Sequence, residues 1–93
     1  MEPSFARKFF IPQIKGRIES YVAREKESLS KLITYIKTMC ERYGITSWEL
    51  QQILIEVKRE SVDPFLDSSK SFYQPKRLRR FEKLCQELRV KII

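Results

Sequence analysis

The chain has 93 residues, of which 42% are hydrophobic and 33% are charged, and its formal net charge is +7. This composition predicts one folded domain with a modest core and excludes wholesale disorder. The sequence has no histidine, the commonest general base and metal ligand, and no Gly-rich phosphate loop, so we predict no enzyme activity, no metal and no cofactor.

The first predicted element is a long helix over residues 12–43. Pro12 suits its first turn, and apolar residues then recur at heptad-like spacing up to Tyr43. A continuous helix of this length would extend roughly 48 Å, more than a domain of this size can cover. We therefore expect a homodimer in which a second copy of the chain covers the apolar stripe. The predicted partner interface consists of Ile14, Ile18, Val22, Leu29, Leu32 and Ile36.

A second structure fits the same pattern. The stripe could belong to two helices that are separated within residues 24–32, where Ser28 or Ser30 would cap the second helix. Because no glycine or proline interrupts residues 17–43, we favour the continuous helix.

Residues 41–54 predict a turn between two helices. Gly44 suits a left-handed C-cap, Thr46 is a good N-cap, and Glu49 stands at the capping-box position three residues later. The second helix is predicted over residues 47–60. Its inward positions are Leu50, Ile53, Leu54 and Val57.

Residues 61–74 are predicted to form a loop, because Asp63, Pro64 and several serines disfavour a helix. Its apolar side chains are expected to fold back on the core. They are Phe65, Leu66, Phe72 and Tyr73.

A third helix is predicted over residues 75–89, with Pro75 at its start. Its apolar residues are spaced by three and four positions, and cations occupy the opposite face at 100° per residue. The apolar positions are Leu78, Phe81, Cys85 and Leu88, and the opposite positions are Lys76, Arg79, Arg80 and Lys83.

The two cysteines, Cys40 and Cys85, lie far apart on apolar stripes and lack CxxC spacing. They predict buried thiols rather than a disulfide. Together the elements predict an all-α fold of three or four helices in a single domain spanning residues 1–93.

The turn segment resembles the helix-turn-helix core of many DNA-binding regulators. A small residue stands four positions before the turn glycine, and apolar residues follow at the expected places: Cys40, Gly44, Ile45, Leu50 and Ile53. The resemblance implies that the second helix presents Thr46, Ser47, Trp48, Gln51 and Gln52 outward. Such side chains can bond base edges, and glutamine suits adenine. The alternative is a plain helical hairpin with solvated polar residues.

Residues 23–50 also resemble part of the histone-like nucleoid-structuring (H-NS) family. There a charged coiled-coil helix runs into a "YG-[IL]-[ST]-x-x-[ED]-L" turn, which this chain matches at Tyr43, Gly44, Ile45, Thr46, Glu49 and Leu50. The resemblance implies helix-mediated oligomerisation and a DNA-linked role. The chain departs from the family because no Arg-Gly-Arg segment follows, and a basic helix stands in its place.

The distribution of charge also favours a nucleic-acid partner. The last segment, residues 70–93, has eight basic and two acidic residues, whereas residues 19–69 have seven basic and nine acidic. Such asymmetry predicts a polyanionic partner. The strongest basic cluster comprises Lys76, Arg77, Arg79, Arg80 and Lys83, which can meet successive phosphates.

Other interpretations of this cluster are a solvated face, an amphipathic helix on anionic lipid, and RNA binding with Phe72 or Tyr73 stacked on an unpaired base. No apolar run approaches the roughly 20 residues of a membrane span, and no cleavage site follows the N-terminal apolar patch, so we expect a cytoplasmic protein without a membrane partner.

We therefore predict a small non-catalytic DNA-binding protein, either a transcriptional regulator or a nucleoid-associated factor. Its predicted nucleic-acid-binding residues are the five basic-helix cations together with Ser47, Gln51 and Gln52. DNA is favoured over RNA as the ligand. The alternative is an interaction adaptor that docks a protein partner through the long helix and Trp48, which otherwise covers the hairpin core.

Overall fold

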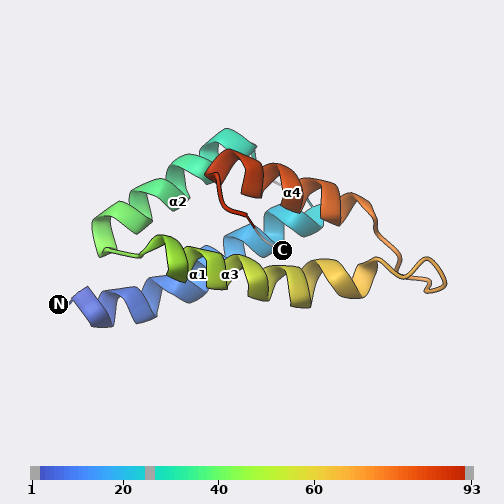
Figure 1. Ribbon diagram of the computed structural model, residues 1–93, viewed down its shortest axis with the longest axis horizontal. Coiled ribbons are helices and arrows are strands. Elements are labelled where there is room, and N and C mark those ends of the chain that lie inside the picture. Colours follow the sequence, from blue (N-terminus) through green and yellow to red (C-terminus); the bar gives the residue numbers. More distant parts are fainter. Residues whose placement is uncertain (1–2, 25–26, 92–93) are drawn as a thin grey trace.

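Four α-helices make up most of the chain in the computed structural model, which describes residues 3–24 and 27–91 (Figure 1). They are α1 (Pro3–Arg24), α2 (Leu29–Tyr43), α3 (Ser47–Val57) and α4 (Lys76–Leu88). No strand occurs among the described residues, so the predicted all-α class is confirmed. Within the same ranges, no helix is both long enough and apolar enough to cross a membrane.

Helix α1 is the central element, because it contacts α2, α3 and α4. In Figure 1, α3 runs alongside α1, while α2 and α4 lie above it in the view. The side chains of Ile14, Ile18 and Val22 have no solvent-exposed surface. They form the centre of a core to which every helix contributes.

The chain does not form one helix over residues 12–43. Helix α1 ends at Arg24 and α2 begins at Leu29. Between them Ser28 is extended, with φ −68° and ψ 146°, and its hydroxyl oxygen accepts a hydrogen bond from the Lys31 amide at 3.3 Å. The continuous-helix prediction is therefore wrong, and the alternative of two helices with Ser28 as the cap is confirmed. The break lets the two halves of the stripe face one another across a single core.

This arrangement also overturns the predicted partner interface. Five of its six residues, Ile14, Ile18, Val22, Leu32 and Ile36, are completely buried within the chain itself, and Leu29 is half-buried. The premise that a second copy is needed to cover them is wrong, because α2, α3 and α4 cover them instead. A homodimer stays a prediction that these residues no longer support.

Helix α1 also begins earlier than predicted, since it starts at Pro3 and includes Pro12 in its interior. An interior proline removes one backbone hydrogen bond and costs about 3 kcal/mol. Tertiary contacts offset that cost on the N-terminal side of Pro12. The Phe10 ring stacks on Tyr43 with centroids 4.4 Å apart, and Arg7 forms an ion pair with Glu49.

The turn between α2 and α3 is confirmed. Gly44 has φ 64° and ψ 32°, and its amide donates to the Cys40 carbonyl. The Thr46 hydroxyl oxygen accepts from the Glu49 amide at 3.1 Å, and a Glu49 carboxylate oxygen accepts from the Thr46 amide at 3.1 Å. This reciprocal capping box begins α3 at Ser47.

The helical path after α3 is longer than predicted. It continues as a π-helical turn, η1 (Lys58–Val62), and a 3₁₀ turn, η2 (Asp63–Phe65). The loop therefore begins at Leu66 rather than at residue 61. The reason is burial, because the side chains of Ser61 and Val62 pack into the interior and continued helical backbone holds them there.

Both cysteines are free thiols, and Cys85 is buried while Cys40 is half-buried. Burial, with a smaller effect of the Glu82 charge, raises the pKa of Cys85 to about 11. The predicted absence of a disulfide between them is confirmed. The thiol of Cys85 acts as a small apolar group of the core.

The two glycines provide a matched test of the turn, because at neither position would an added Cβ meet an atom within 4 Å outside the local backbone. Replacing Gly44 by alanine should lower the free energy of unfolding by about 1–2 kcal/mol, since a Cβ disfavours its left-handed backbone. Gly16→Ala, inside α1, should raise the same free energy by about 0.5–1 kcal/mol. Urea denaturation measures both changes, and changes of the same sign would contradict the backbone assignment.

A second test concerns pH. The pKa of Glu49 is lowered, first by its hydrogen bond to Arg7 and then by the Thr46 amide. Its stabilising effect is thus present above the ordinary carboxyl pKa and is lost as pH falls through the lowered folded-state pKa. We expect Glu49→Gln to melt at a lower temperature than the parent near neutral pH, and the difference to vanish in acid. Glu41→Gln, at an exposed position without an ion pair among the described residues, is the control and should show little change at either pH.

Candidate nucleic-acid interface

The outer face of α4 presents a row of cations to solvent. The helix buries Phe81 and Leu84, and at 100° per residue the opposite direction falls on Lys76, Arg79 and Lys83. All three are exposed. They span about 10 Å along the helix axis. We call these three residues the cationic row.

No residue of the cationic row forms an ion pair in the part of the chain that the structure describes, although Glu82 and Glu87 lie on the same helix. Lys15 of α1 bridges Glu56 and Glu60 at 3.4 and 2.6 Å. The remaining pairs are Arg7–Glu49, Arg17–Glu27 and Lys58–Asp63. Every carboxylate in these pairs lies between residues 27 and 63, so α1 and Lys58 match five of the nine acidic residues in the middle of the sequence. The positive charge of α4 is left facing solvent.

Arg80 does not belong to the outer face, which corrects the prediction from helical periodicity. Its Nη1 donates to the carbonyl oxygens of Val22 and Ala23 at 2.8 and 3.2 Å. These carbonyls lie in the last turn of α1, where the helix itself supplies no partner and its dipole attracts a cation. Arg80 therefore caps α1. Periodicity missed this role because the carbonyls lie 57 and 58 residues away in the sequence.

Arg77 is also committed to the fold. Its Nη1 donates to the Ser61 carbonyl at 3.0 Å, its Nε donates to the Gln74 Oε1 at 2.9 Å, and its guanidinium lies 3.6 Å from the centroid of the Phe65 ring. Burial, and then the charges of Arg80 and Arg24, lower its pKa from the ordinary value. Thus two of the five predicted phosphate-binding cations hold neighbouring elements together.

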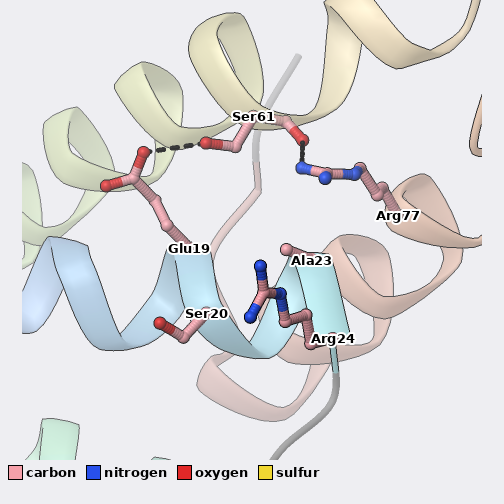
Figure 2. A pocket seen from close by; sticks show the side chains of 6 residues that line it. All are labelled: Glu19, Ser20, Ala23, Arg24, Ser61 and Arg77. Carbon is pink, nitrogen blue, oxygen red and sulfur yellow. Dashed lines mark hydrogen bonds between the residues drawn. The ribbon is translucent and has the colours of Figure 1, made fainter. Parts of the chain in front are cut away.

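Figure 2 shows how Arg77 connects to α1. The Ser61 hydroxyl donates to a Glu19 carboxylate oxygen at 2.8 Å, while the Ser61 carbonyl accepts from Arg77. These bonds border an open hollow of about 280 Å³ whose other lining residues are Ser20, Ala23 and Arg24. Because the Glu19 carboxylate and the Ser61 hydroxyl bond one another, we interpret this hollow as a structural contact between α1, η1 and α4.

The predicted base-reading residues of α3 do not join the cationic row. Gln51 donates through Nε2 to the Lys91 carbonyl at 3.1 Å, Gln52 is half-buried, and Ser47 is exposed. The N-terminal end of α3 borders the last turn of α4 at Leu88. Lys76, at the start of α4, is about 18 Å from that turn along the helix axis. Lys83 is closer, at about 8 Å from Leu88 along the same axis.

Trp48 is 67% exposed and does not cover the hairpin core as expected. On the helical wheel it shares the outer face of α3 with Gln52 and Ile55. Ile45 and Leu50 fill the space beneath the turn instead, and both are buried.

The loop aromatics also differ from expectation. Phe72 and Tyr73 are 47% and 42% exposed, whereas Phe65 and Leu66 are half-buried as predicted. The loop closes on itself, because the Gln74 amide donates to the Phe65 carbonyl at 2.7 Å and the rings of Phe65 and Phe72 meet edge to face at 5.8 Å. Two aromatic side chains thus stand in solvent beside the first turn of α4.

Comparison with protein-family models, with curated proteins and with solved structures found no match for this chain. The likeness of residues 39–54 to helix-turn-helix regulators and of residues 23–50 to the H-NS family therefore stays a resemblance of sequence motifs.

The assignment of Arg80 to the fold can be tested against its neighbour Arg79. Arg80→Ala should lower the free energy of unfolding by about 1–3 kcal/mol, because it leaves the α1 carbonyls without their charged donor. Arg79→Ala should change it by less than about 0.5 kcal/mol, as expected for an exposed side chain. Thermal and urea denaturation measure both, and equal effects would contradict the capping role.

Proposed function

We propose that this protein binds DNA without catalysis and holds the phosphate backbone with the cationic row. The observation that supports this most is the segregation of charge. Five carboxylates between residues 27 and 63 pair with Lys58 and with cations of α1, and Lys76, Arg79 and Lys83 stay exposed together. Phosphate contacts of this kind release counterions and make binding strongly dependent on salt.

The proposal assigns binding to α4 and not to α3. Helix α3 contains no lysine or arginine, and the amide of Gln51 is already bonded to the C-terminal segment. Contacts that are limited to phosphates position a protein on DNA but carry little sequence information. A nucleoid-associated factor with weak sequence preference fits this pattern better than a regulator that reads one operator.

An interaction adaptor is the second candidate, and the exposed Trp48 favours it. A tryptophan that is 67% exposed is costly to leave in water and is enriched at the centres of protein interfaces. The two candidates make different predictions for heparin, an immobilised polyanion. DNA binding requires elution at high salt, whereas a protein that docks through Trp48 alone elutes early.

The DNA-binding proposal can be tested by removing two charges from the row. The double variant Arg79→Ala and Lys83→Ala should weaken binding to all duplex sequences alike. It should also reduce the slope of log affinity against log salt by roughly 1.8, because each phosphate that is no longer neutralised accounts for about 0.9. Fluorescence anisotropy over a range of salt concentrations measures the slope.

The matched control removes two other exposed cations, Lys8 and Arg42. They lie near the N-terminal half of α1 and the end of α2, which meet at the Phe10–Tyr43 stack, and so they are remote from the first turn of α4. Lys8→Ala with Arg42→Ala has the same net charge as the test variant and should retain the parental slope. If both double variants lose the same affinity, the binding depends on net charge alone and the assignment to α4 is wrong.

A further inference from the structure

A cleft of about 310 Å³ opens beside the first residue of the cationic row. It is formed where the end of α1 meets the loop before α4. Its lining combines apolar and aromatic groups with polar and charged ones. The lining residues are Ala23, Tyr73, Gln74, Pro75, Lys76 and Arg80.

We infer that this cleft accepts one unpaired nucleobase, so that the preferred ligand is a nucleic acid with single-stranded nucleotides rather than a continuous duplex. The inference rests on the proposed function, because the cationic row would hold the phosphates on either side of that base. It deepens that function by naming the class of nucleic acid.

The aromatic surface for the base is the Tyr73 ring. It is 42% exposed, and backbone hydrogen bonds hold its loop on both sides. The Tyr73 amide donates to the Lys70 carbonyl at 3.2 Å, and the Gln74 amide donates to the Phe65 carbonyl at 2.7 Å. A backbone that is already held in place costs little further ordering when a base stacks on its side chain, and such stacking accepts any base.

A hydrogen-bond donor for the edge of the base is supplied by Gln74. Its Oε1 accepts from Arg77 Nε at 2.9 Å, which orients the amide and leaves the NH₂ group as the donor. Within the described residues, no hydrogen bond uses that NH₂ group. Carbonyl oxygens and unprotonated ring nitrogens of nucleobases are suitable acceptors.

The charges of the cleft suit a nucleotide more than an isolated apolar ligand. Lys76 both lines the cleft and begins the cationic row, so a phosphate attached to the bound base would lie on that row. Arg80 adds a second positive charge while it remains bonded to the carbonyls of α1. Bases within a duplex are stacked on their neighbours and cannot reach Tyr73, whereas unpaired bases can.

The experiment compares two fluorescent probes by anisotropy at one low salt concentration. One is a short blunt DNA duplex, and the other is the same duplex extended by a short single-stranded thymidine tail. The full-length parent should bind the tailed probe roughly tenfold more tightly, as expected for one stacked base. Tyr73→Ala should remove this preference and leave the affinity for the blunt duplex unchanged.

Two further variants separate stacking from a change of fold. Tyr73→Phe keeps the ring and should retain the preference, whereas Tyr73→Leu keeps apolar bulk without the ring and should lose it. Circular dichroism should show parental helicity for all three variants, because Tyr73 lies outside the core.

The outcomes distinguish the two proposals. If the parent binds both probes equally and Tyr73→Ala binds them as the parent does, the cleft does not accept a base, while the DNA-binding proposal stands. If the parent binds neither probe, the proposed function is wrong and the inference falls with it. A preference for the tail that survives in Tyr73→Leu would also overturn the inference, because stacking would not be its source.

Discussion

Burial of one face of α1 is the constraint on which the rest of the structure depends. Ile14, Ile18 and Val22 have no exposed surface, and helices from the whole remainder of the chain contact α1. Such burial contributes roughly 1.5–3 kcal/mol for each large apolar side chain. A single unbroken helix would leave the second half of the stripe out of reach of the first. The separation of α1 from α2 allows both halves to share one core.

The same packing decides which charges of α4 reach solvent. Burial of Phe81 and Leu84 fixes the rotation of the helix, and this rotation turns Arg80 toward the open carbonyls of α1. Arg77 is drawn to the Ser61 carbonyl in the same way. The remaining cations, Lys76, Arg79 and Lys83, face outward. The candidate interface thus consists of the cations of the basic segment that do not bond to the fold, because Arg77 and Arg80 are bonded to backbone carbonyls.

Ion pairing sharpens this division of charge. Arg7 and Lys15 of α1 lie against carboxylates of α3 and of the turn η1 that follows it. Exposed pairs of this kind contribute little to stability, about 0–1 kcal/mol each. Their larger effect is on the electric field around the molecule. They neutralise cations of α1 against carboxylates of α3 and η1, whereas the cations of the cationic row on α4 stay unpaired among the described residues. A moderate net charge then becomes a directed positive surface.

The sequence by itself determined the features whose interacting groups are neighbours in the chain. Gly44 and the Thr46–Glu49 capping box could be predicted because each bond closes within four or five residues, and the inward positions of α3 followed from helical periodicity. In α4 periodicity predicted the burial of Phe81 and Cys85 but missed that of Leu84. Tertiary structure alone decided that the stripe of α1 would be buried within one chain, that Arg80 would cap a helix 58 residues away, and that Phe72 and Tyr73 would stand in solvent. These outcomes depend on which surfaces pack together. Periodicity along one helix predicts which face is apolar but not which element will cover it. The physical reason is that a long-range contact competes with every other contact the same side chain could make, and only the assembled core decides between them.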